Sequence, residues 1–377
     1  MCGGEVTVAA GVAGVEAVVR SDAALLEGDL AAFLGSVIAA PADASVFGAA
    51  VRRSLCGPVA DAVGSKVGQA ALPAGGAGGV PVRPSMVYWA YRNYRGFPED
   101  GADQGADLAV IRRAAVAVRI LLKAAVALDD IQDGSVSRYG EAALHVDHGV
   151  PIALNTGSWL INAALRHAGD PAVVDSLLRS VGDGFTGQAV DMSTRSPLTR
   201  AELMAAPRDA RVGFWESTAA LKTGTLFWMP LDAAVAGLRV VEDDRRALDD
   251  AMRQLGLASQ LFNDLTDFVP ELGGANTQED YDGLSNRVFL ELLDSAPFGR
   301  QTPDGEEMRS FVLGHPQLND TLLALAEQAV ELKRAAKDAV HQVCRSERSA
   351  AYFDLTIERK GHLIDRLHRT LAQRTST

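Results

Sequence analysis

The chain has 377 residues, of which 47% are apolar, so it can bury a sizeable core. Its 36 Lys and Arg against 48 Asp and Glu give a net charge of −12, which argues against nucleic acid or an acidic membrane surface as a partner. Cys2, Cys56 and Cys344 are far apart and form no CxxC pair, which argues against a disulfide framework and favours a reducing, cytoplasmic setting.

Alanine is abundant, and apolar residues recur at the three- and four-residue spacing that is typical of helices. In chain order, this spacing predicts helices over residues 22–34, 44–63, 84–94, 108–133, 154–167, 172–192, 211–235, 243–269 and 319–345. Gly- and Pro-rich composition predicts loops over residues 71–84, 273–283 and 297–306. No stretch of 18 or more residues has the composition of a membrane span.

No linker in the sequence is long enough to separate two folding units, and no internal repeat is visible. We therefore expect one all-α domain over residues 1–377, with residues 1–20 as a candidate for disorder. The expected architecture is an orthogonal bundle of roughly ten or more helices around a central cavity.

The first acidic cluster consists of Asp129, Asp130 and Asp133 at the end of a strongly apolar predicted helix. Asp129 and Asp133 are four residues apart, so they share one helix face. Two like charges at a helix C-terminus are destabilising unless a cation lies between them. Oxygen ligands without His or Cys indicate Mg²⁺, although a solvated helix end would explain a single cluster of this kind.

The second acidic cluster consists of Asn263, Asp264, Asp267 and Glu271. Asn263, Asp267 and Glu271 follow one another at four-residue intervals, so the predicted helix over residues 243–269 would place them on one face. The flanking residues are apolar and would bury this helix. Two such clusters in one helical chain favour a site for metal and diphosphate over two solvated surfaces.

Together with GGVPVRP at 78–84, GQAVD at 187–191 and LKTG at 221–224, these clusters make the chain resemble the trans-isoprenyl diphosphate synthases, the polyprenyl synthetase family. The resemblance covers about residues 76–293. It implies an all-α bundle with a deep pocket, a homodimer, and three Mg²⁺ on an allylic diphosphate. The ligands that it implies are Asp129, Asp133, Asn263, Asp267 and Glu271, with Asp130 and Asp264 as supporting residues or further ligands.

The resemblance also implies side chains that contact the diphosphate and the prenyl chain. Arg138 and Lys222 are expected to act in catalysis as charge-assisted donors to the leaving diphosphate. Gln188 and Arg287 are further diphosphate candidates, with a polar helix face and a surface arginine as the respective alternatives. Trp228 is expected either to line the prenyl tunnel, where its ring would stabilise positive charge, or to pack in the core.

The sequence departs from the family where a second diphosphate, that of isopentenyl diphosphate, is bound. Val80, Leu122 and Tyr139 stand where the family carries a lysine, a histidine and an arginine, and only Arg83 is retained. One arginine cannot compensate for the desolvation of a diphosphate, so these four positions are expected to form an acceptor pocket for a flat aromatic molecule. Replacement of the lost charge by Lys123 after a local shift remains the alternative.

The expected function is Mg²⁺-dependent ionisation of an allylic diphosphate, with transfer of the prenyl group to an aromatic, indole-like acceptor. Ala124 and Ala125 stand where short-chain members carry aromatic residues, so the tunnel is expected to admit a C15–C20 chain. The chain would then be a divergent member similar to the indole-prenylating or the terpene-cyclising relatives. A class I terpene cyclase, a chain-elongating synthase and a non-catalytic regulatory subunit remain alternatives.

Overall fold

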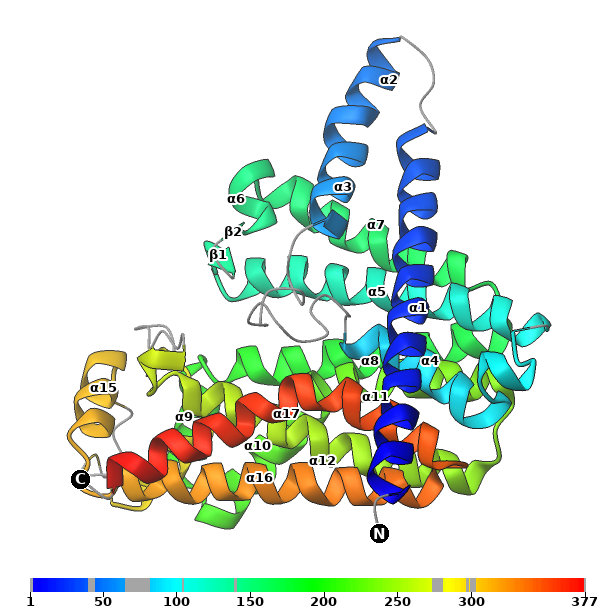
Figure 1. The fold of residues 1–377 in the computed structure, drawn as a ribbon. Helices are drawn as coiled ribbons and strands as arrows, with labels where there is room; N and C mark the ends of the chain where they lie inside the picture. The colour runs from blue at the N-terminus through cyan, green and yellow to red at the C-terminus, as the bar shows by residue number, and fades with distance from the viewer. Residues whose placement is uncertain are drawn as a thin grey trace. The chain divides into compact units, whose positions relative to one another are not determined.

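The computed structural model describes residues 3–39, 45–64, 82–103, 105–138, 141–272, 281–295, 298 and 303–375. Helices dominate these residues, which confirms the predicted all-α fold class (Figure 1). The chain divides into two compact units. Unit 1 comprises Met1–Leu178, Met229–Arg245 and Cys344–Ile357, and unit 2 comprises Arg179–Trp228, Arg246–Val343 and Glu358–Thr377.

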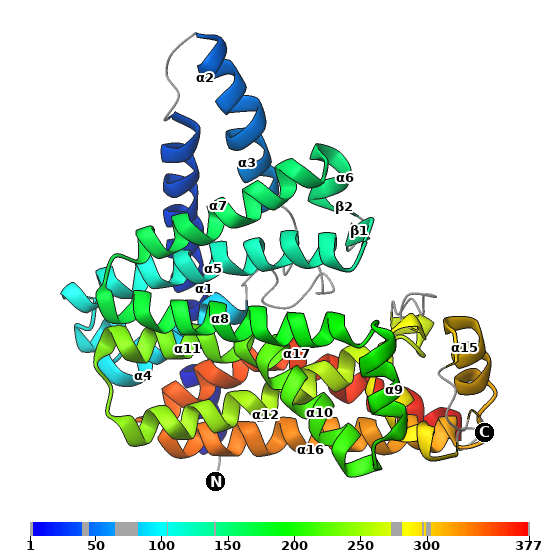
Figure 2. The same cartoon turned by 180° about the vertical axis from the view of Figure 1, so that it is seen from behind.

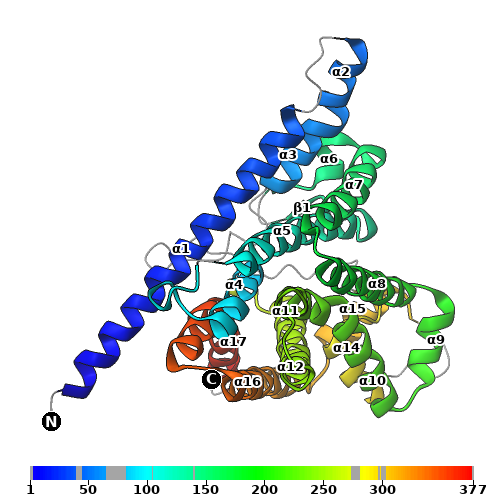
Figure 3. The same ribbon diagram turned by 90° about the vertical axis from the view of Figure 1, so that its right-hand side faces the viewer.

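Unit 1 is built around one long helix, α5. The elements that lie wholly in this unit are α1 (Gly3–Ala39), α2 (Val46–Val51), a π-helical turn (Arg52–Cys56), α3 (Gly57–Gly64), α4 (Val82–Arg95), a 3₁₀ turn (Pro98–Asp100), α5 (Ala106–Gln132), β1 (Ser137–Arg138), β2 (Glu141–Ala142), α6 (Leu144–His148) and α7 (Val150–Ala168). β1 and β2 form a short antiparallel pair. Figure 3 shows α1 as a single long helix.

The alanine-rich sequence of α5 lets its neighbours approach closely. α5 contacts α1, α3, α4, α6 and α7, and it lies alongside α7 (Figure 2). A Cβ atom on Gly157 of α7 would lie 2.8 Å from the side chain of Leu128, so a larger residue there would displace that side chain. Asp22 of α1 is buried and accepts hydrogen bonds from Arg92 of α4 and from Tyr352, which fixes α1 and α4 within the unit.

Unit 2 contains the second core. Its elements are α9 (Pro197–Ala205), α10 (Arg208–Ala219), a π-helical turn (Ala220–Gly224), a 3₁₀ turn (Pro270–Leu272), α14 (Arg287–Leu292), a 3₁₀ turn (Leu293–Ser295), α15 (Gly305–Leu313) and α16 (Leu318–Val343). Four helices are shared between the two units, namely α8 (Pro171–Ser193), α11 (Thr225–Leu238), α12 (Glu242–Thr266) and α17 (Glu347–Thr375). The unit 2 core is apolar, and the rings of Tyr281 and Phe289 stack in it with centroids 5.0 Å apart.

Several predicted boundaries differ from the observed ones. α1 begins at Gly3, so residues 3–20, the candidate for disorder, are helical. Small apolar residues dominate this stretch and leave no polar face to reveal the helix. α9, α14, α15 and α17 were not predicted as helices, and the predicted loops over 71–84 and 273–283 fall mostly outside the described residues. Among the described helices, none is both long enough and apolar enough to cross a membrane.

Candidate functional site

The first acidic cluster lies at the C-terminal end of α5, in unit 1. The backbone N–H of Asp133, which caps the helix, donates to the carbonyl of Asp129 at 2.8 Å, so the predicted four-residue register holds. Asp129 and Asp133 are half-buried, whereas Asp130 is 3% exposed. The partial exposure of Asp129 and Asp133 is compatible with binding a metal ion. The burial of Asp130 is compatible with a supporting role.

The second acidic cluster lies in unit 2 at the end of α12, and here the predicted helical ladder is wrong. α12 ends at Thr266, and Glu271 lies beyond it in the 3₁₀ turn of Pro270–Leu272. Pro270 explains this end because a proline disfavours helical geometry in the residue before it and lacks an N–H. Asn263 and Asp264 are therefore the helical members of the cluster, and Asp267 follows the helix.

The members of this cluster have different partners. Asn263 is exposed, and Asp267 accepts a hydrogen bond from the amide of Asn286 at 3.3 Å. Glu271 forms an ion pair with Arg374 of α17 at 2.5 Å. The exposed Glu271 carboxyl accepts hydrogen bonds from its own backbone N–H, which has the larger effect, and from Arg374. Both lower the pKa of this carboxyl below its usual value. Glu271 therefore has a cationic partner that a metal ion would have to replace.

Asp264 points into the core of unit 2. It is 5% exposed and accepts hydrogen bonds from the indole N–H of Trp215 at 2.9 Å, the amide of Gln260 at 2.7 Å and the backbone N–H of Arg287 at 2.8 Å. Burial raises the pKa of its carboxyl to about 7. Both carboxylate oxygens are engaged inside the unit, so the geometry favours a supporting role over direct coordination.

Lys222 lies on the π-helical turn of Ala220–Gly224, which interrupts the helix predicted over 211–235. π-turns inside helices often occur at functional sites. The Lys222 ammonium is 2.6 Å from the carboxylate of Asp191 on α8. The hydroxyl of Thr223 donates to the side-chain oxygen of Gln260 at 2.5 Å. Since Gln260 also donates to Asp264, a chain of hydrogen bonds joins the π-turn to the second acidic cluster.

Sequence reasoning did not assign roles to Thr223 and Gln260. Gln260 precedes Asp264 by four residues, which places both side chains on one face of α12, and this spacing was the available signal. Gln188, one of the predicted diphosphate residues, is 7% exposed on α8. Its side-chain nitrogen has no hydrogen-bond partner among the residues that the structure describes.

Two glycines let neighbouring helices press against the π-turn. A Cβ atom on Gly187 of α8 would lie 2.5 Å from the backbone nitrogen of Lys222. A Cβ atom on Gly256 of α12 would lie 2.4 Å from the Cα of Gly224. Real Cβ atoms do not approach backbone this closely, so the position of Lys222 depends on glycine at both sites.

Gly256→Ala is therefore expected to destabilise the protein by about 1–3 kcal/mol, because its methyl group would displace the π-turn. Urea unfolding followed by circular dichroism would measure the change. Gly182→Ala is the matched control, since Gly182 is an exposed helical glycine with nothing within 4 Å of its would-be Cβ. The control is expected to be neutral or stabilising by up to about 1 kcal/mol. Equal stability of the two variants would contradict the close packing.

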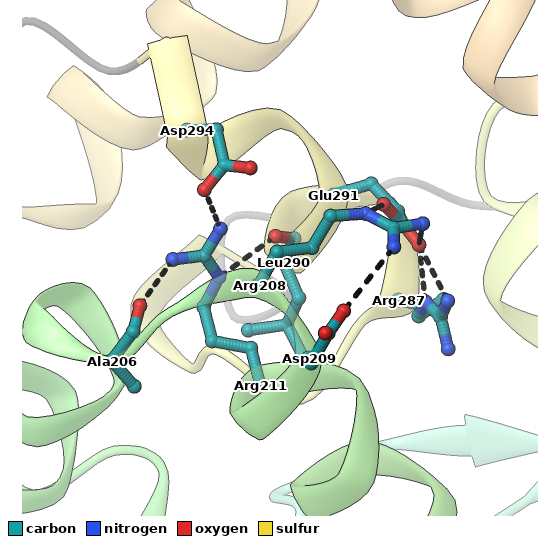
Figure 4. A network of polar contacts seen from close by, with 8 residues as sticks. All are labelled: Ala206, Arg208, Asp209, Arg211, Arg287, Leu290, Glu291 and Asp294. Carbon is teal, nitrogen blue, oxygen red and sulfur yellow. Dashed lines mark hydrogen bonds and ion pairs between the residues drawn. The ribbon is translucent and has the colours of Figure 1, made fainter.

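Arg287 is buried, so the alternative that it is a surface arginine is wrong. It is 3% exposed, donates twice to Glu291 at 3.0 and 2.5 Å, and holds its guanidinium 5.3 Å from the centroid of the Trp215 ring. Figure 4 shows Glu291 shared between Arg287 and Arg208. The guanidinium nitrogen Nη1 of Arg287 has no partner among the described residues, and its diphosphate role stays a prediction.

The other predicted site residues are placed less completely. Arg138 lies in β1, and Val80 and Tyr139 lie outside the described residues, so the predicted acceptor pocket is described only at Arg83 and Leu122. The remaining positions differ in burial: Arg83, Leu122 and Trp228 are half-buried, Ala124 is buried and Ala125 is exposed.

The donor set fits a hard divalent cation. Across the described part of the chain, no group of three or more His, Cys, Asp and Glu side chains is arranged to hold a metal ion. Mg²⁺ does not need such a cage, because it is commonly bound by one or two carboxylates together with substrate phosphates. The half-buried pair Asp129 and Asp133 offers such a carboxylate set.

Curated relatives match part of the chain. Fusoxypene synthase from Fusarium oxysporum is 26% identical over 273 residues, which cover 68% of this chain and 33% of that protein. The short chain isoprenyl diphosphate synthase of Methanothermobacter thermautotrophicus is 29% identical over 237 residues, covering 58% of this chain and 65% of its own length. Prenyl transferase penC from Penicillium crustosum is 27% identical over 228 residues, covering 58% and 59%. The chain thus matches between a third and two thirds of each of these relatives.

Solved structures share the fold. A geranylgeranyl pyrophosphate synthetase from Pyrococcus horikoshii matches with a TM-score of 0.67 at 18% identity, covering 92% of this chain and 98% of that chain. A polyprenyl synthase from Caulobacter crescentus, complexed with calcium and isoprenyl diphosphate, matches with a TM-score of 0.62 at 21% identity, covering 92% and 98%. The family model described as Polyprenyl synthetase matches residues 67–282, more than half of the chain. The resemblance in the motifs is therefore confirmed, and the chain belongs to the polyprenyl synthetase family.

Proposed function

We propose that this protein ionises a C15–C20 allylic prenyl diphosphate with Mg²⁺ and transfers the prenyl group to an aromatic, indole-like acceptor. One observation carries the proposal. Residues for one diphosphate are retained, among them Asp129 and Lys222, whereas the family's cationic positions for a second diphosphate hold Val80, Leu122 and Tyr139. Membership of the polyprenyl synthetase family supports the allylic diphosphate as the first substrate.

The proposed reaction begins with cleavage of the bond between the allylic carbon and the diphosphate oxygen. The electron pair leaves with the diphosphate, and an allylic cation remains. Mg²⁺ ions held by Asp129 and Asp133, and a further ion held by Asn263 and Asp267, would supply charge stabilisation for the leaving group. Lys222 would donate to the diphosphate, and the carboxylate of Asp191, 2.6 Å away, holds the ammonium in place.

The acceptor then completes the reaction. A carbon of the electron-rich ring gives its π electron pair to the allylic cation, and a carbon–carbon bond forms. The proton that this ring carbon loses is taken up by the released diphosphate, so charge and atoms balance. The apolar positions Val80, Leu122 and Tyr139 would contact the flat ring rather than a second diphosphate.

A class I terpene cyclase is the second candidate, in which the cation reacts within its own chain. The name of the relative fusoxypene synthase favours this reading, as does the spacing of Asn263, Asp267 and Glu271, which is similar to the cyclase metal triad. The end of α12 at Thr266 counts against it, because Glu271 lies outside the helix and is paired with Arg374.

Parallel incubations separate the candidates. The protein receives Mg²⁺ and either farnesyl or geranylgeranyl diphosphate, together with indole, isopentenyl diphosphate or no partner, and the products are identified by mass spectrometry. A prenylated ring is the expected product. A hydrocarbon or alcohol formed without a partner would indicate a cyclase, and a longer diphosphate would indicate a chain-elongating synthase. Absence of diphosphate release in every tube would indicate a regulatory subunit.

A further inference from the structure

Two buried cationic side chains lie on α5, apart from the predicted metal and diphosphate residues. Arg119 and Lys123 are four residues apart, and each is only 3% exposed. Residues at this spacing share one helix face, where like charges repel. Burial of a charged group is destabilising unless an opposite charge compensates for it. The fold therefore concentrates positive charge inside unit 1.

The guanidinium of Arg119 has an unfilled binding edge. Its Nε and Nη2 atoms are buried and have no hydrogen-bond partner among the residues that the structure describes. The N–H groups of these two nitrogens point in the same direction, along the edge with which an arginine binds a carboxylate or phosphate through two parallel hydrogen bonds.

Other arginines of unit 1 use the same edge to hold a carboxylate of the chain itself. Nε and Nη2 of Arg112, on the same helix, donate to the two oxygens of Asp29 at 2.8 and 2.6 Å. The same atoms of Arg92 donate to the two oxygens of Asp22. At Arg119 no described residue supplies the acceptor.

Among the described residues, the acidic groups that act on the pair lie at or near the surface. Glu27 and Glu141 act on Lys123 electrostatically, but Glu27 is exposed and Glu141 only half-buried. Burial lowers the pKa of Arg119, and burial followed by the charge of Arg119 lowers the pKa of Lys123 to about 7. An anion bound between the two side chains would remove this conflict.

We propose that Arg119 and Lys123 form a buried oxyanion site in unit 1, which binds the carboxylate or phosphate group of a small molecule. At about 1.5 Å per helical residue, Lys123 and Arg119 lie roughly 9 and 15 Å before Asp129 along α5. That separation suits a second substrate whose reacting end lies near the first acidic cluster. An aromatic carboxylate and isopentenyl diphosphate are the two sources of such an anion. Assigning the anion to a second substrate rests on the proposed function, whereas the site itself does not.

Thermal unfolding with and without added anion tests the site. The measurement is made in EDTA, so that metal-dependent diphosphate binding does not contribute, with indole-3-carboxylate, isopentenyl diphosphate or uncharged indole as the probe. At about ten times its Kd, a bound anion is expected to raise the Tm of the wild-type protein by about 2 °C. Arg119→Met is expected to abolish this rise, and its own Tm without anion should exceed that of the wild type, because a buried uncompensated charge has been removed.

Arg112→Met is the matched control, because Arg112 lies on the same helix and its binding edge is filled by Asp29. This variant should keep the full anion-dependent rise, and Lys123→Met should reduce it. Three results would each overturn the site. They are an anion-dependent rise in Tm that is unchanged in Arg119→Met, no rise in Tm with either anion, and a Tm of Arg119→Met without anion that is lower than that of the wild type. A rise with isopentenyl diphosphate alone would support the site and overturn the proposed aromatic acceptor, so the two failures are distinguishable.

Discussion

Asp129→Ala is expected to lower the rate of diphosphate release from an allylic diphosphate by about 1,000-fold or more. Metal ions contribute several kcal/mol to stabilising a leaving group of this charge, and every 1.36 kcal/mol corresponds to a tenfold change in rate. Asp129 is half-buried and shares its helix face with Asp133, so its substitution is expected to remove a ligand of the proposed metal site. Release of diphosphate, measured in excess Mg²⁺ with a coupled assay, gives the rate.

Asp183→Ala is the control for this prediction, since Asp183 is an exposed carboxylate on α8. The control should release diphosphate at the wild-type rate, and both variants should unfold at a Tm close to that of the wild type. Wild-type activity of Asp129→Ala would refute the metal assignment. Loss of activity in Asp183→Ala as well would show that the assay responds to a general loss of negative charge.

Lys222→Met is expected to lower kcat about 100- to 1,000-fold, because removal of one donor from a developing anion has an effect of this size. The methionine side chain has a similar length, so packing of the half-buried stem is retained. Asp191→Asn removes the negative charge of the carboxylate paired with Lys222 but keeps the ammonium, and it should lower kcat less than tenfold. Steady-state kinetics of both variants measure the difference.

A kcat for Lys222→Met within threefold of the wild type would contradict the role of Lys222 as a donor to the leaving diphosphate. A loss in Asp191→Asn as large as in Lys222→Met would assign the effect to the ion pair. A parallel measurement of KM separates weaker substrate binding from slower ionisation, because a donor that acts on the developing charge changes kcat.

Much of the fold was predictable because helical periodicity is a local property of the sequence. The cluster at the end of α5 was located correctly, since its apolar stripe continues to Leu128 and its acidic residues follow at once. The end of α12 was misplaced because the acidic spacing of Asn263, Asp267 and Glu271 imitates a helix. Pro270 carried the contrary signal, and the observed turn follows it.

Other features depend on tertiary contacts that no local pattern carries. The π-turn around Lys222 reflects the close approach of Gly187 and Gly256, which are distant from it in sequence. The fully engaged carboxylate of Asp264 depends on Trp215, 49 residues away. The burial of Arg119 was equally hidden, since a charged residue on a helix is ordinarily expected to face solvent.

Calorimetric titration in Mg²⁺ tests the loss of the second diphosphate site most directly. The protein is titrated with isopentenyl diphosphate and with a non-reactive thio analogue of geranylgeranyl diphosphate. The allylic analogue is expected to bind with a Kd in the micromolar range, and isopentenyl diphosphate is expected to show no saturable binding, alone or with the analogue present. Micromolar binding of isopentenyl diphosphate to the complex with the analogue would contradict the account.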